Sequence, residues 1–135
     1  MQYFNWRTVT LFICGVVHLL PVTGVFGRDA LLSLYGAPID SDALLLLMQH
    51  RAILFGIIGA VLLVSIVRKH LQNAALLIVT VSMMSFVVLM LLNAEQSPPL
   101  QRVMWVDLVL LVGIAIDAVI NKKASKTLAF HNDEK

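Results

Sequence analysis

Four long apolar stretches separated by short polar segments limit what this chain of 135 residues can fold into. Each stretch has close to the about 20 residues that a helix needs to cross the hydrocarbon layer of a bilayer. Lipid offers no partner for free backbone N–H and C=O groups, which leaves helices and closed barrels as spanning structures, and the alternation typical of barrel strands is absent. We therefore predict an all-α integral membrane protein, an up-down four-helix bundle with spans over about 8–26, 43–67, 74–92 and 103–120.

The composition agrees with this class. Hydrophobic residues make up 59% of the chain and charged residues 13%, which is too apolar for a soluble domain. The length allows four spans and short connections, so we expect a single transmembrane domain over 1–135, with a polar cytoplasmic tail over 121–135. The basic residues are dispersed among the loops, which argues against a nucleic-acid partner. Cys14 is the only cysteine, so no internal disulfide can form.

A short amphipathic segment follows the first span. It runs from Arg28 to Tyr35, is too short to cross a bilayer, and is stopped by Gly36 and Pro38. We predict a short interfacial helix between the first and second spans. The next residues are N-cap candidates for the second spanning helix: Asp40, Ser41 and Asp42.

The distribution of Lys and Arg predicts the orientation. Seven of the ten lie in segments that an up-down topology places on one side of the membrane, at positions 7, 68, 69, 122, 123, 126 and 135. Such an excess of cations is typical of cytoplasmic segments. We therefore expect a multi-pass protein with both termini cytoplasmic and the lipid bilayer as its main partner.

Polar side chains inside the apolar stretches are the candidate functional residues. A charged side chain at a helix centre costs about 2.5 to 3.5 kcal/mol on insertion scales, so each calls for a partner. His18 shares a helix face with Gly15 and Pro21, and Pro21 should bend the helix beside it. Two interpretations stay open: a neutral histidine hydrogen-bonded to a neighbouring helix, or a group that binds a ligand or carries a proton.

Arg51 and Asp107 are expected at similar depth. They can form an ion pair, or each can reach toward water independently near the end of its helix. Asp117 does not share a helix face with Asp107, and we expect it to pair with Lys122, Lys123 or a basic residue of the Arg68 loop. The full set of candidate ligand-binding residues is His18, Arg51, Asp107, Gln49 and His50.

Small residues in the second span predict a helix contact. Ala52, Gly56 and Ala60 recur every four residues, with Gly59 beside them, and such spacing lets transmembrane helices approach closely. Gln49 continues the same face and can donate a hydrogen bond across it. In the first span, Gly15 and Pro21 are the corresponding packing residues. The small residues of the second span, which we call the small-residue seam, pack against either another helix of this chain or a second subunit.

Two segments resemble a known family. The connection Leu34-Tyr35-Gly36-Ala37-Pro38, the arginine-led helix from His50 to Gly59, and an acidic residue early in the last span, Asp107, resemble the DoxX-like superfamily of small four-helix bacterial inner-membrane proteins. The likeness covers about residues 8–120 and points to an uncharacterised branch. It implies a four-helix fold and a bacterial inner-membrane location. Some DoxX-like proteins act as membrane subunits of quinone-linked oxidoreductases, but nothing here matches a quinone site residue by residue.

Three functions remain open on sequence grounds. The favoured one is a non-enzymatic bundle that binds a small hydrophobic molecule, a quinone or a lipid, with His18, Arg51 and Asp107 as polar anchors. The second is an accessory or assembly subunit of a membrane complex, or a homo-oligomer, held by the small-residue seam. The third is a membrane isomerase or redox enzyme that uses His18 and Asp107. No cofactor motif is present, and the four histidines lie at different depths without metal-ligand spacing.

Overall fold

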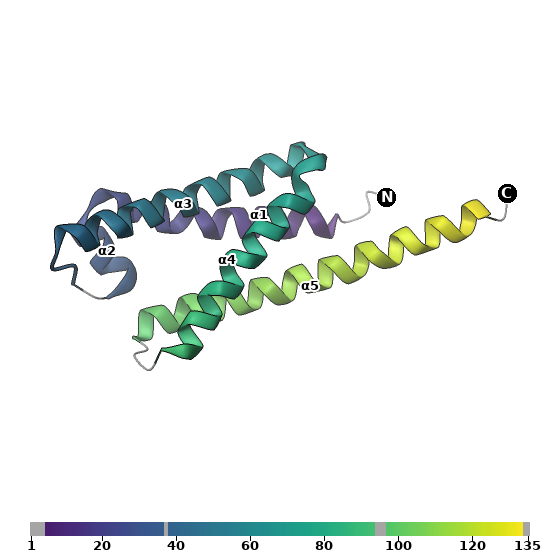
Figure 1. Ribbon diagram of the computed structural model, residues 1–135. Helices are drawn as coiled ribbons and strands as arrows, with labels where there is room; N and C mark the ends of the chain where they lie inside the picture. Colours follow the sequence, from purple (N-terminus) through teal and green to yellow (C-terminus); the bar gives the residue numbers. More distant parts are fainter. Residues whose placement is uncertain (1–4, 37, 94–96, 134–135) are drawn as a thin grey trace.

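The computed structural model describes residues 5–36, 38–93 and 97–133, with side chains as far as Lys122. The described part is helical and contains no strand, which confirms the all-α prediction (Figure 1). The elements in chain order are α1 (Trp6–Leu19), the 3-10 helix η1 (Leu20–Phe26), α2 (Arg28–Tyr35), α3 (Asp42–Val67), the 3-10 helix η2 (Lys69–Leu71), α4 (Gln72–Leu92) and α5 (Pro98–Asp133).

Four helical segments are long and apolar enough to cross a membrane. They are Trp6–Phe26, Asp42–Val67, Lys69–Leu92 and Pro98–Lys122, and they contain the four predicted spans. Large apolar side chains cover their outer surfaces; Phe12, Leu46 and Val109, for example, are more than half exposed. A surface of this kind needs an apolar solvent. These are the features of a small multi-pass membrane protein.

The first span changes helix type at Pro21. The proline has no N–H to donate to the carbonyl of residue 17, and the chain tightens from α1 into η1. The bend predicted at Pro21 is therefore a change from α to 3-10 geometry. Gly27, at φ 117°, then turns the chain into α2, and Gly36, at φ 67°, ends α2 in the left-handed conformation that favours glycine. The predicted bounds of the short helix, 28–35, are confirmed.

Polar contacts fix the start of α3. Its N-cap is Ser41, whose Oγ accepts a hydrogen bond from the Leu44 N–H at 3.1 Å. Arg28, at the start of α2, forms an ion pair with Asp42 and donates from Nε to the Ile39 carbonyl at 3.0 Å. The connection between α2 and α3 is therefore fixed by Arg28 of α2 and by the Ser41 cap of α3.

The last helix is longer than expected. Pro98 and Pro99 open α5, where a missing N–H costs nothing. The segment after residue 120 was expected to be a polar tail, but its backbone stays helical to Asp133 and extends beyond the other helices (Figure 1). Lys and Ala, frequent in this segment, are strong helix formers, which accounts for the continuation.

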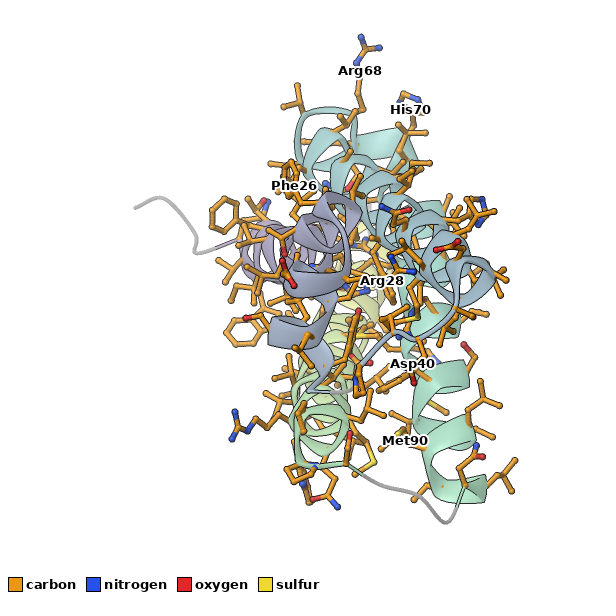
Figure 2. All side chains as sticks on the ribbon, turned by 90° about the vertical axis from the view of Figure 1, so that its left-hand side faces the viewer. Phe26, Arg28, Asp40, Arg68, His70 and Met90 are labelled. Carbon is orange, nitrogen blue, oxygen red and sulfur yellow. The ribbon has the colours of Figure 1, made fainter. Side chains whose placement is uncertain are left out.

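The helices alternate in direction, as expected of an up-down four-helix bundle, but they do not all run parallel to one another. The start of α1, the connection at η2 and the end of α5 lie on one side, which we call the η2 end. α2, the end of α4 and the start of α5 lie on the other, which we call the α2 end (Figure 1). α1 and α3 pack along their length, whereas α4 runs steeply across them, from His70 at the top of Figure 2 to Met90 near its bottom. The main core forms where α1, α3 and α4 cross and includes Leu11, Leu62, Val79 and Met83.

Candidate functional site

A cavity of about 230 Å³ lies toward the α2 end, between α1, η1, α2, α3, α4 and α5. Most of its wall is apolar. His18, Arg51 and Asp107 all line it, so the structure brings together the three residues that the sequence singles out as polar anchors. Pro21 also lines the cavity, where the change to 3-10 geometry shifts the chain beside His18.

His18 is buried, with 3% of its surface exposed. Its Nδ1 lies 2.9 Å from the carbonyl oxygen of Cys14, one turn earlier in the same helix. Only an N–H can donate to a carbonyl, so in the neutral ring the proton is on Nδ1 and Nε2 is the acceptor. The predicted bond to a neighbouring helix is therefore wrong: the partner belongs to α1 itself. No described residue hydrogen-bonds to Nε2, so this atom is available to a ligand in the cavity.

Arg51 lies among three aromatic rings. Its guanidinium carbon is 5.2 Å from the ring centre of Phe55, 5.5 Å from that of Phe86 and 5.6 Å from that of Tyr35. The rings come from three different helices: Tyr35 from α2, Phe55 from α3 and Phe86 from α4. Phe55 also contacts the His18 ring, with centroids 5.7 Å apart. The aromatic cluster therefore connects the arginine to the histidine.

The rings account for a cation at this depth without a counter-charge. A cation–π contact contributes about 0.5 to 1 kcal/mol at an exposed site and about 2 kcal/mol when desolvated. The summed free energy of three such contacts is of the same order as the insertion cost of about 2.5 to 3.5 kcal/mol for an arginine. However, cation–π contacts leave the N–H groups unsatisfied. Among the residues with described side chains, none hydrogen-bonds or ion-pairs with the Arg51 guanidinium.

Asp107 faces the same cavity and is 9% exposed. It lies within electrostatic range of Arg51, but no ion pair joins these two described residues. The ion pair between Arg51 and Asp107 is therefore not formed, and the alternative, that each side chain reaches toward water independently, stays a prediction. The Asp107 carboxylate, the His18 imidazole and the guanidinium groups of Arg51 and Arg102 thus line one small space, and no ion pair joins these described residues.

A larger groove of about 590 Å³ lies on the other side of Arg51, between α3, α4 and the start of α5. It exists because α4 diverges from α3 toward the α2 end. The groove and the smaller cavity share Arg51, Phe55 and Phe86 as a common wall. The α4 side of the groove adds the polar residues Ser82, Ser85 and Asn93.

The two neighbours of Arg51 in sequence lie elsewhere. Gln49 donates from Nε2 to the Val25 carbonyl at 2.9 Å, which ties α3 to η1, and it lines neither the cavity nor the groove. His50 is exposed and likewise lines neither space. The structure therefore does not bring these two predicted ligand-binding residues to the cavity.

The small residues of α3 contact the first span of the same chain. A Cβ added to Gly59 would lie 2.9 Å from the Gly15 carbonyl oxygen, and one added to Gly56 would lie 2.9 Å from Val22 Cγ2. Ala52 is buried near Gly24, where η1 packs. Ala60, by contrast, is exposed and outside the seam. The seam therefore packs against the first span of the same chain, and Gly59 contacts the backbone of Gly15.

Asp117 belongs to a separate polar cluster at the η2 end. Its side chain is 1% exposed and its Oδ2 lies 3.4 Å from Arg7 Nε. Asn121 donates to Asp117 Oδ1 at 2.8 Å, and Arg7 also donates to Asn73 Oδ1 at 2.8 Å. Of the predicted partners, Lys122 and the basic residues of the Arg68 loop are wrong, and the side chain of Lys123 lies outside the described residues. Arg7 of α1 reaches α5 because the two helices converge there.

Sequence reasoning missed the three aromatic residues around Arg51. Tyr35 was read as part of the interfacial helix, and Phe55 and Phe86 as apolar positions among many. A signal was present, since the chain has only two tyrosines and six phenylalanines, but aromatic residues on different helices give no spacing to test. No group of three or more metal-ligating side chains occurs within the described residues.

No protein-family model, curated protein or solved structure matches the chain. The resemblance to DoxX-like proteins therefore stays a prediction.

Proposed function

We propose that the chain is a ligand-binding membrane protein that holds a small hydrophobic molecule in the cavity between its helices. The observation that carries the proposal is the gathering of His18, Arg51 and Asp107 around one mostly apolar space of about 230 Å³. Ligand sites are concave, predominantly apolar and equipped with a few convergent polar groups. The polar residues come from α1, α3 and α5, so only the folded chain creates the site.

The three polar groups suggest the chemistry of the ligand. Arg51 offers N–H donors, whereas His18 Nε2 and the Asp107 carboxylate offer acceptors. The hydroxyl groups of a quinol both donate and accept, so they can satisfy both kinds, whereas the carbonyl oxygens of a quinone accept from Arg51. The volume is below the about 300 to 1,000 Å³ of common ligand pockets, so it fits such a headgroup but not a long tail. A tail would extend into the surrounding lipid.

Thermal unfolding of the purified protein tests the proposal. We would measure the melting temperature in neutral detergent with a panel of short-chain quinones and quinols. A ligand at 100 times its Kd should stabilise the fold by about 2.7 kcal/mol. The shift should disappear in His18→Ala and Asp107→Asn. His50→Ala is the matched control, because it removes an exposed imidazole outside the cavity, and it should keep the shift. Absence of any shift, or an equal shift in all variants, would count against the proposal.

For the cellular setting, we propose a DoxX-like protein of the bacterial inner membrane with both ends in the cytoplasm. The resemblance in sequence and the cation distribution support this. Arg7, Arg68 and Lys69 lie at the η2 end, together with the end of α5. Labelling of single cysteines introduced at Lys69 and at Ser33 with an impermeant reagent tests the orientation. Only the cysteine at position 33 should react from outside intact spheroplasts; reaction at position 69 would reverse the orientation.

A further inference from the structure

The groove between α3 and α4 is separate from the cavity of the proposed function and has a different electrostatic character. Both spaces share Arg51, but Asp107 lines only the cavity. No carboxylate occurs among the described residues that line the groove. Arg51, Arg102 and Asp107 line the cavity, so an anion there would lie beside a carboxylate, whereas Arg51 is the only charged residue among the described residues that line the groove.

Arg51 presents unused donors to this groove. The aromatic rings hold the guanidinium, and no residue with a described side chain accepts a hydrogen bond from it. A guanidinium matches the two oxygens of a carboxylate or phosphate through paired N–H groups, and such charge-assisted bonds are among the strongest in proteins. The rings also fix the arginine in place, which lowers the entropic cost of binding an anion.

The rest of the groove suits an amphiphile. On α4, Ser85 donates its hydroxyl hydrogen to the Ser82 carbonyl at 2.8 Å. Asn93, which follows α4, uses one of its two amide hydrogens on the Leu89 carbonyl at 2.7 Å. The Ser82 hydroxyl donates to no described residue and is available in the groove that Arg51 also lines. The remaining wall is apolar and includes Leu89, Met90 and Leu100. One charged corner and a long apolar wall match a headgroup and a hydrocarbon chain.

We propose that this groove is a binding site for an acidic membrane lipid, whose carboxylate or phosphate group is held by Arg51 and Ser82 and whose chain lies along α4 and the start of α5. The lipid enters sideways between α3 and α4, where α4 diverges. The site does not depend on the quinone-type ligand of the cavity.

The experiment measures lipid-dependent stabilisation of the full-length protein in neutral detergent. The probes are phosphatidylglycerol and oleate, their uncharged counterparts diacylglycerol and methyl oleate, and inorganic phosphate alone. We expect a rise in melting temperature with at least one acidic lipid and none with the other three probes. Which acidic lipid acts identifies the headgroup. An equal rise with the uncharged counterparts, or with inorganic phosphate alone, would overturn the proposal.

Matched variants locate the site. Arg51→Gln should weaken binding of the acidic lipid by about tenfold or more, because a charge-assisted pair is lost. Arg102→Gln removes the same charge from a residue that lines the cavity but not the groove, and it should keep full binding of the acidic lipid. Ser85→Asp, at an exposed position, places a competing carboxylate in the groove and should also weaken binding, whereas Ser33→Asp on α2 should not. Unchanged binding in both Arg51→Gln and Ser85→Asp would refute the assignment.

The two proposals can fail independently. His18→Ala and Asp107→Asn, which should abolish the response to quinones, should leave the response to acidic lipid intact. Ser85→Asp should weaken the response to acidic lipid and leave the response to quinones intact. If the lipid response follows His18 and Asp107 instead, the lipid occupies the cavity and the groove is not its site.

Discussion

The two ends of the molecule use an arginine and an aspartate in opposite ways. At the η2 end, Arg7 and Asp117 lie 3.4 Å apart, and Asn73 and Asn121 take up further hydrogen-bonding groups. At the α2 end, Arg51 and Asp107 share a cavity wall but form no ion pair.

Helix convergence explains the difference. Where α1, α4 and α5 come together, opposite charges meet directly and the cluster connects three helices. Where α4 diverges, Arg51 is surrounded by aromatic rings and Asp107 lies at the cavity wall. The same residue types therefore form a structural link at one end and a candidate binding site at the other.

The largest loss of stability that this comparison predicts follows from breaking the ion pair between Arg7 and Asp117. Asp117→Asn keeps the shape of the side chain but leaves the arginine without its counter-charge. Breaking a fully buried pair costs about 3 to 5 kcal/mol; because the Arg7 side chain is 24% exposed, we expect about 2 to 4 kcal/mol. Unfolding of the purified protein in detergent, followed by tryptophan fluorescence, measures this loss.

Asp107→Asn is the counterpart at the α2 end. It breaks no ion pair and should lower the stability by about 1 kcal/mol or less, within the range of ordinary substitutions. If Asp107→Asn cost as much as Asp117→Asn, the distinction between a structural link and a binding site would be wrong.

The next effect concerns the seam that joins the two ends. Gly59→Ala would place a Cβ 2.9 Å from the Gly15 carbonyl oxygen, which is backbone and cannot rotate away. Separating α1 from α3 to relieve this contact should lower the stability by about 1 to 3 kcal/mol, as overpacking commonly does. Gly113→Ala is the matched control, because a Cβ there meets nothing within 4 Å. By helix propensity alone it should be neutral or stabilising. Similar losses in both variants would show that the seam is not tight.

Local sequence signals predicted most of the fold. The lengths of the apolar stretches predicted the four long helices. Gly36 predicted the end of α2, and the Ser41 cap predicted the start of α3. These features depend on residues close in sequence, which is why they could be recognised. The continuation of α5 was missed because a polar segment after a span was taken as a tail, although its residues favour helix.

The site was only half predictable for a related reason. The cost of polar groups in lipid singles out His18, Arg51 and Asp107 without any knowledge of packing. Their neighbours depend on which helices converge and where. The pairing of Arg7 with Asp117 joins residues 110 positions apart, and no periodicity relates them. Likewise, nothing in the sequence distinguishes Phe86 from the apolar residues around it.

The smallest predicted effect tests the aromatic support of Arg51. Phe86→Leu keeps an apolar side chain but removes the cation–π contact from α4, while Tyr35 and Phe55 remain. We expect a loss of about 0.5 to 1 kcal/mol, and a coupling of similar size to Arg51→Gln in a double-mutant cycle. Phe12→Leu, at an outward-facing position 55% exposed, is the control and should show no coupling. If Phe86→Leu and Arg51→Gln were additive, the rings would contribute packing alone, and the unpaired cation at the α2 end would need another source of stabilisation.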